Sequence, residues 1–282
     1  MIDLEFLRHL DKLSLIINKR VTSNYVGERQ SEFAGEGLLF KDHRIYAPGD
    51  DIKNIDWRVY ARTDDLFVRK FEAERNLTVH VVLDMSASMD FGKPFKKSSY
   101  SGMLAMGFAY MALKNNEKFV ISTFSDKLEV FKAQKGKGQL MKVFDYLNKK
   151  RPIGTSKLGV SLSKYKKFVD SKSLIVIVSD FLYDIEEIKN VLYRFKRNDV
   201  KLIQVLDKTE SKLNIEGDYK LKDLETSSIL RTFIGPFLRK RYFTKLEEHQ
   251  HNIKEACAET GAKFYAVSTE KPIFDVFYDI LR

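Results

Sequence analysis

The sequence has almost no cysteine. Cys257 is the single one among 282 residues, so an internal disulfide is impossible, and the four Cys or Cys/His ligands of a structural zinc site cannot be assembled. We expect a protein of the reducing cytoplasm whose fold depends on apolar packing, with Cys257 acting as a small buried hydrophobe.

Proline, glycine and long apolar runs are also scarce. Five Pro and 14 Gly, with 44% apolar and 31% charged residues, exclude a collagenous, low-complexity or broadly disordered chain. The apolar runs fall far short of the roughly 18 residues that a membrane helix needs, and the first residues mix charges into their apolar pattern. The sequence therefore predicts a globular protein without signal peptide or membrane span, although peripheral membrane contact stays open.

Common catalytic motifs are missing as well. The chain contains no Gly-x-Ser-x-Gly elbow and no Gly-x-x-x-x-Gly-Lys-Ser/Thr loop, which argues against a serine hydrolase and a nucleotide-driven motor. His249 and His251 are two positions apart in an expected helix, so they point in different directions. We expect a protein that is not an enzyme.

Acidic residues are depleted in one window. The chain has 49 Lys and Arg against 39 Asp and Glu, and residues 127–172 hold 13 of the basic residues against three acids, which equals the whole excess of ten. A concentrated basic surface favours an anionic partner such as an acidic protein, a nucleic acid or a lipid headgroup, but it is also typical of solvated helices.

The hydrophobic pattern predicts a doubly wound α/β fold with a mostly parallel sheet. Nearly continuous apolar strands alternate with helices, as expected for a sheet covered on both faces. We expect an N-terminal subdomain at 1–76, with an amphipathic helix at 3–19, an irregular stretch at 20–65 and a short strand at 66–71. The α/β domain at 77–282 includes a hairpin insertion near 211–235. Its expected strands are 77–84, 117–124, 128–133, 173–180, 200–207 and 263–269, and its expected helices are 96–114, 138–150, 156–170, 184–197 and 236–260, followed by a closing helix.

Oxygen-bearing side chains follow three of these strands and loops. The first strand of the domain ends in Asp84-Met85-Ser86-Ala87-Ser88, the loop before residue 156 holds Gly154-Thr155-Ser156, and a later strand ends in Ser179-Asp180. Since ligands of parallel sheets bind at the carboxyl ends of strands, we expect these groups to meet. An all-oxygen set suits Mg²⁺ or Mn²⁺ better than zinc or copper.

Other interpretations of these residues exist. Ser86 and Ser88 could simply cap a helix, with Asp180 in a turn. A haloacid-dehalogenase-like phosphatase also has an Asp after its first strand, but it needs a second carboxylate two residues later, where Ser86 stands. A nucleic-acid-binding protein using the basic face of 127–172 is the main alternative, although the aromatic residues there have the spacing of core positions.

The chain resembles a known family at these residues. Asp84-x-Ser86-x-Ser88, Thr155 and Asp180 resemble the metal-ion-dependent adhesion site of von Willebrand factor type A domains, over about residues 75–210. A signature from Gly37 to Arg62 resembles the prokaryotic family named domain of unknown function fifty-eight. The resemblance implies that Ser86, Ser88 and Thr155 bind Mg²⁺ directly, and that Asp84 and Asp180 bind it directly or through water.

The resemblance also implies a partner. Members of this family often accompany MoxR-type AAA+ ATPases, so we expect an adaptor that binds an acidic residue of such an ATPase or its client. Basic residues at or near the metal rim would steer that partner. The candidates are Arg151, Lys157, Lys164, Lys166 and Lys167.

Overall fold

The structure is a computed structural model that describes residues 6, 9–10, 39–72, 77–132 and 134–281. The chain forms two compact units. One is Arg20–Asn76, and the other combines Leu77–Arg282 with the described residues among the first nineteen. Most of the helix expected at 3–19, and the start of the signature at Gly37, lie outside the described residues.

The smaller unit is a hairpin with two short helices. Strands β1 (Leu39–Ile45) and β2 (Phe67–Glu72) pair antiparallel, and between them lie η1 (Ile52–Asn54) and α2 (Trp57–Thr63). The carboxylate of Asp56 caps α2 by accepting the N–H groups of Arg58 and Val59, and it also bonds to His43 at 2.9 Å. This part of the chain, expected to be irregular, is therefore ordered by local capping and side-chain pairing.

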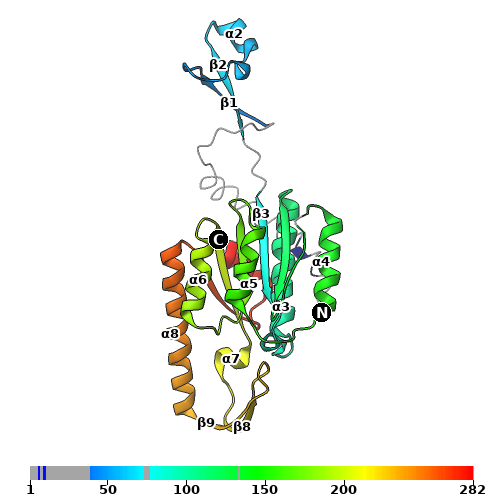
Figure 1. Ribbon diagram of the computed structural model, residues 1–282, viewed down its shortest axis with the longest axis vertical. Coiled ribbons are helices and arrows are strands. Elements are labelled where there is room, and N and C mark those ends of the chain that lie inside the picture. The colour runs from blue at the N-terminus through cyan, green and yellow to red at the C-terminus, as the bar shows by residue number, and fades with distance from the viewer. Residues whose placement is uncertain (1–5, 7–8, 11–38, 73–76, 133, 282) are drawn as a thin grey trace. The chain divides into compact units, whose positions relative to one another are not determined.

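A six-stranded sheet forms the centre of the larger unit (Figure 1). The strand order is β10-β7-β6-β3-β4-β5, and every pairing is parallel except that of the edge strand β5. Its strands are β3 (Thr78–Asp84), β4 (Lys118–Phe124), β5 (Leu128–Val130), β6 (Leu174–Ser179), β7 (Asp199–Leu206) and β10 (Lys263–Ser268). The predicted doubly wound α/β fold is confirmed.

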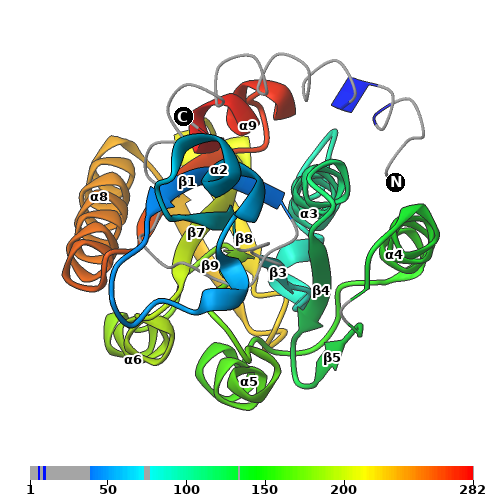
Figure 2. The same cartoon turned by 90° about the horizontal axis from the view of Figure 1, so that it is seen from above.

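Helices cover both faces of this sheet (Figure 2). One layer contains α3 (Lys97–Lys114), α4 (Lys137–Lys149) and α9 (Ile273–Leu281), and the other contains α5 (Leu158–Tyr165), α6 (Ile185–Phe195) and α8 (Pro236–Thr260). The remaining elements lie in connections. They are η2 (Ala87–Asp90), η3 (Lys166–Phe168), α7 (Lys208–Lys212) and the hairpin of β8 (Gly217–Lys222) and β9 (Ile229–Ile234).

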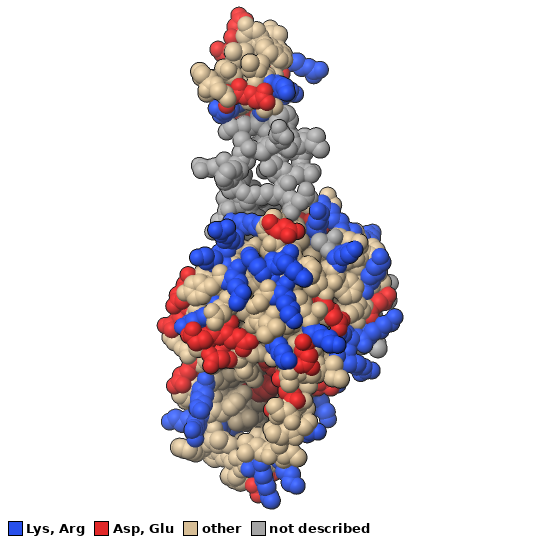
Figure 3. All heavy atoms as spheres, viewed as in Figure 1, with Lys and Arg blue, Asp and Glu red and all other residues tan. Residues whose placement is uncertain are grey.

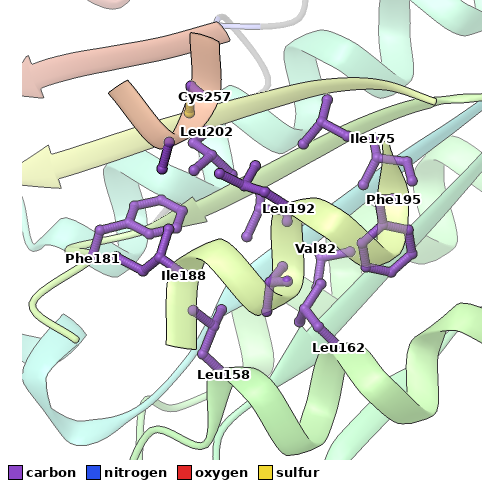
Figure 4. Close-up of a cluster of buried hydrophobic side chains, with 14 of the residues drawn as sticks. Val82, Leu158, Leu162, Ile175, Phe181, Ile188, Leu192, Phe195, Leu202 and Cys257 are labelled. Carbon is purple, nitrogen blue, oxygen red and sulfur yellow. The ribbon is translucent and has the colours of Figure 1, made fainter. Parts of the chain in front are cut away.

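Buried apolar side chains fill the layer between the sheet and helices α5, α6 and α8 (Figure 4). All six residues of β6 are buried, which explains the absence of alternation in its sequence, since both faces of a central parallel strand are covered. Cys257 belongs to this cluster at 2% exposure, and burial raises the pKa of its thiol to about 12. The expectation that it serves as a buried hydrophobe is confirmed.

Most elements of the sheet domain begin and end within two residues of the expected positions. The helix expected at 156–170 is shorter, because α5 ends at Tyr165 and the chain continues as the 3-10 helix η3 to Phe168. The strand expected at 128–133 stops at Val130. Periodicity located these elements well, while their ends depend on local backbone bonding.

Gly107 of α3 allows close packing against α9. A Cβ built at this position would lie 1.9 Å from Cζ of Phe277, a fully buried ring. We expect Gly107→Ala to lower the free energy of unfolding by about 1–3 kcal/mol, because the ring has to move within a close-packed layer. Urea unfolding measures this change.

Gly138 of α4 is the matched control. A Cβ there meets nothing within 4 Å, so Gly138→Ala should stabilise the protein by about 0.5–1 kcal/mol through helix propensity. Equal effects of the two substitutions would contradict the packing of α9 onto α3.

Candidate functional site

The candidate site lies at the carboxyl edge of the parallel strands. Because β3, β4 and β6 run in the same direction, the residues that follow them share one edge of the sheet. Two backbone bonds join the loops there: the N–H of Ile153 donates to Met85 O, and the N–H of Ala87 donates to Gly154 O, each at 2.9 Å. We call this edge the rim; it comprises residues 84–90, 125–127, 151–157 and 179–184.

Asp84 is the centre of the rim. Its side chain is fully buried, and Oδ1 accepts the backbone N–H of Ser86 at 2.9 Å. Oδ2 accepts the hydroxyls of Ser156 at 2.9 Å and Ser179 at 2.8 Å, and also that of Tyr183. Three segments that are far apart in the sequence therefore converge on one carboxylate.

Burial makes the charge of Asp84 costly. Desolvation, helped by the nearby charge of Asp180, raises the pKa of Asp84 above its ordinary 3.8. A raised pKa means that the folded protein favours the neutral acid, so the free energy of unfolding falls as the pH rises from 3.8, the ordinary pKa, through the raised pKa of the folded state. Burial and Asp84 also raise the pKa of Tyr183, which keeps its phenol protonated and able to donate.

The other expected ligands form two further contacts. The hydroxyls of Ser86 and Ser88 lie 3.1 Å apart. Thr155 donates its hydroxyl to Oδ1 of Asp126 at 2.6 Å and its N–H to the same oxygen at 3.3 Å. This bond, with the charge of Lys157 as a smaller effect, lowers the pKa of Asp126.

Gly154 is required for the approach of Asp126 to Thr155. Its φ is +83°, and a Cβ at this position would lie 2.2 Å from Oδ2 of Asp126. Both the backbone conformation and the close carboxylate therefore exclude a larger residue at Gly154.

A buried lysine neutralises the second expected carboxylate. Lys97, only 1% exposed, contacts Asp180 at 3.1 Å and Glu210 at 2.8 Å. Burial alone would lower the pKa of Lys97, but the two carboxylates outweigh this effect and raise it. Lys97 therefore stays charged inside the protein.

The charges around Asp84 do not balance. Asp84, Asp180 and Glu210 supply three carboxylates, and Lys97 supplies one ammonium. Two negative charges remain when all four groups are ionised. A divalent cation would neutralise them.

The structure brings Asp84, Ser86 and Ser88 together. Thr155 instead donates to Asp126, and Asp180 accepts from Lys97. Their roles as metal ligands stay predictions. The sequence did not predict that Asp84 accepts the hydroxyls of Ser156, Ser179 and Tyr183. It also did not predict that the buried Lys97 contacts two carboxylates. Ser156 and Ser179 stand in the oxygen-rich segments, so they could have been found; Tyr183 and Lys97 carry no pattern that marks them.

The expected partner-binding lysines lie at two places. Lys157 and Arg151 are exposed on the rim. Lys164, Lys166 and Lys167 are exposed at the far end of the eight-residue helix α5 and in η3, roughly 12 Å from the rim at 1.5 Å per residue. Figure 3 shows Lys and Arg gathered over the upper part of the sheet domain, the end at which β3 begins in Figure 1. Their role in partner binding stays a prediction.

The aromatic residues of the basic window do not form a stacking surface. Phe144 and Tyr165 are buried, and Phe131 packs on Tyr146 with 4.5 Å between ring centroids. Phe168, 40% exposed, is the exception. Since single-stranded nucleic acids bind on several exposed rings, this arrangement disfavours the nucleic-acid interpretation.

We expect Lys97→Met to lower the free energy of unfolding by about 3–5 kcal/mol, because Asp180 and Glu210 would lose their buried counter-ion. Lys96→Met is the matched control, since Lys96 pairs with Asp90 on the surface and such pairs contribute about 1 kcal/mol or less. Urea unfolding of both variants measures the difference. A small effect of Lys97→Met would show that the buried pair does not support the rim.

Neither a membrane helix nor a preformed metal cluster is found in the described residues. No helix there is long and apolar enough to cross a membrane. No group of three or more His, Cys, Asp or Glu side chains in these segments is arranged to hold a metal ion, so a cation at the rim would depend on hydroxyl ligands besides its carboxylates.

Curated sequences and solved structures include proteins similar to this chain. The uncharacterized protein Rv1480 of Mycobacterium tuberculosis is 26% identical over 279 residues, which are 97% of this chain and 87% of that protein. The pilus adhesin SpaC of Lactobacillus rhamnosus GG superimposes with a TM-score of 0.50 at 10% identity, over 74% of this chain and 30% of SpaC, which supports the fold alone. The conserved hypothetical protein BatB of Bacteroides thetaiotaomicron gives a TM-score of 0.44 at 12% identity, over 72% of this chain and 96% of BatB. A family model described as "Protein of unknown function DUF58" matches residues 42–252, and the chain belongs to this family.

Proposed function

We propose that the rim binds Mg²⁺ or Mn²⁺ and that the bound cation holds an acidic residue of a protein partner. The supporting observation is the convergence of Ser86, Ser156 and Ser179 on the buried carboxylate of Asp84. N-terminal capping alone would not require hydroxyls from separate segments around one carboxylate.

The side chains at the rim fit a hard divalent cation. Their donors are carboxylate and hydroxyl oxygens, which Mg²⁺ and Mn²⁺ prefer. With Asp84, Asp180, Glu210 and Lys97 all ionised, two negative charges would remain to be neutralised. Asp84, Ser86 and Ser88 would hold the ion. Thr155 would also bind the ion once its hydroxyl no longer donates to Asp126. Asp180 would bind the ion directly or through water while it still accepts a hydrogen bond from Lys97.

The proposed role is not catalytic. No His or Cys in the described residues bonds to the hydroxyls of Ser86, Ser88 or Ser156. Asp84, which accepts the Ser156 hydroxyl, would be a ligand of the cation in this proposal and not a base that activates a nucleophile. The position two residues after Asp84, where a phosphatase of the kind considered above has its second carboxylate, is Ser86. We therefore infer an adaptor, with a MoxR-type AAA+ ATPase or its client as the partner.

Titration calorimetry with Mg²⁺ and Mn²⁺ tests the metal site. Asp84→Asn should abolish binding, because it removes the central charged ligand, while the metal-free variant should be at least as stable as the parent near pH 7, since the costly buried charge is gone. The double variant Ser86→Ala/Ser88→Ala should also lose affinity.

Asp90→Asn is the control, because Asp90 lies in the same loop but is exposed and pairs with Lys96. It should bind as the parent does. Unchanged affinity in Asp84→Asn would refute the proposed metal site.

Binding kinetics with a purified MoxR-type ATPase test the partner. Reversing the charges of Lys164, Lys166 and Lys167 should slow association and flatten its salt dependence, because steering acts over a Debye length of about 10 Å at 0.1 M salt. Thr155→Ala and EDTA should instead speed dissociation. If EDTA leaves the lifetime of the complex unchanged, the partner is not held through a cation.

A further inference from the structure

One side chain of the hairpin of β8 and β9 forms a hydrogen bond to the rim. Every residue from 218 to 230 is exposed except Glu225, which is half-buried. Oε2 of Glu225 accepts the backbone N–H of Ser156 at 3.2 Å. Of the hydrogen bonds and ion pairs found for residues 218–230 in the described part of the chain, this is the one that leaves the hairpin.

The turn of the hairpin is closed by its own hydrogen bonds. Oδ1 of Asp223 accepts the N–H groups of Glu225 at 2.8 Å and Thr226 at 3.3 Å, and Oδ2 accepts the Thr226 hydroxyl at 2.6 Å. The N–H of Asp223 donates to Ser228 O at 2.9 Å. The turn is thus fixed without help from the sheet, and Glu225 remains available to contact the rim.

Ser156 places Glu225 next to the centre of the candidate site. The same serine donates its N–H to Glu225 and its hydroxyl to Oδ2 of Asp84 at 2.9 Å. Two carboxylates therefore bind to the two donors of one residue.

We propose that Glu225 is an internal occupant of the partner site. This inference rests on the proposed function, in which a partner offers a carboxylate to a cation at the rim. The hairpin supplies the same chemical group from within the chain, so an acidic partner binds only after Glu225 has left. Glu225 also indicates which ligand the site takes from a partner: a glutamate side chain on an exposed turn.

Displacement of Glu225 should be inexpensive for the fold. The hairpin loses one hydrogen bond to the sheet domain, whereas its strand pairing and its turn remain. A competing internal ligand lowers the apparent affinity for a partner by the fraction of time that the site is open. We expect removal of Glu225 to raise the apparent affinity for a free carboxylate about tenfold.

Acetate is the probe, and its methyl proton relaxation by bound Mn²⁺ is the readout. In the Mn²⁺-loaded protein, Glu225→Gln should increase acetate binding about tenfold, because it removes the charged competitor. Glu225→Asp should do the same although it keeps the charge, since its side chain is too short by one methylene to reach Ser156. Asp218→Asn is the control: it removes one negative charge from an exposed position of the same hairpin and should match the parent.

Hydrogen exchange of the Ser156 amide supplies a readout that is independent of metal. Glu225→Ala should reduce its protection, while Asp218→Asn should not. If Mn²⁺ binds through Asp84 but acetate binding is equal in the parent and in both Glu225 variants, the internal-occupant proposal is overturned and the metal site stands. If Asp84→Asn still binds Mn²⁺, the proposed function itself fails, and the role of Glu225 with it.

Discussion

The burial of Asp84 is the constraint on which the rim depends. A carboxylate at the end of a central strand, without access to water, needs donors or a cation to remain charged. The surrounding loops meet this need with the Ser86 amide and the hydroxyls of Ser156, Ser179 and Tyr183. These donors can meet at Asp84 because the loops that follow parallel strands lie at the same edge of the sheet.

Lys97 shows that the protein treats its two central carboxylates differently. Asp180 has an internal counter-ion in Lys97, whereas the contacts of Asp84 in the described residues are neutral donors. Among the described residues, Asp84 has no positively charged side chain bonded to it that would offset desolvation, so its pKa rises. This asymmetry supports the proposal that Asp84 is the carboxylate whose charge a cation would balance.

The sequence predicted the fold well because the fold depends on periodic patterns. The continuous apolar strand at Leu174–Ser179 and the amphipathic helices around it identify a covered parallel sheet without any knowledge of contacts. The location of the candidate site followed from the same logic, since Asp84 and Ser179 end buried strands and Ser156 lies just before a helix. Which side chains bond to each other could not be predicted in this way: the Thr155–Asp126 and Asp180–Lys97 pairs depend on side-chain directions in loops, where no periodicity constrains them.

The composition of the rim also bears on how a bound cation would behave. Hydroxyls are neutral, so a divalent ion held by Asp84 and by serine and threonine oxygens would have one charged ligand that is not shared with a lysine. Such an ion attracts a further carboxylate more strongly than one already surrounded by acids. Glu225, which accepts the amide of Ser156, is a carboxylate of this chain next to that position. Because this is the one hydrogen bond found from residues 218–230 to the sheet domain, its loss would leave the sheet intact. Under the proposed function, these ligands would favour reversible capture of an acidic group over permanent metal storage.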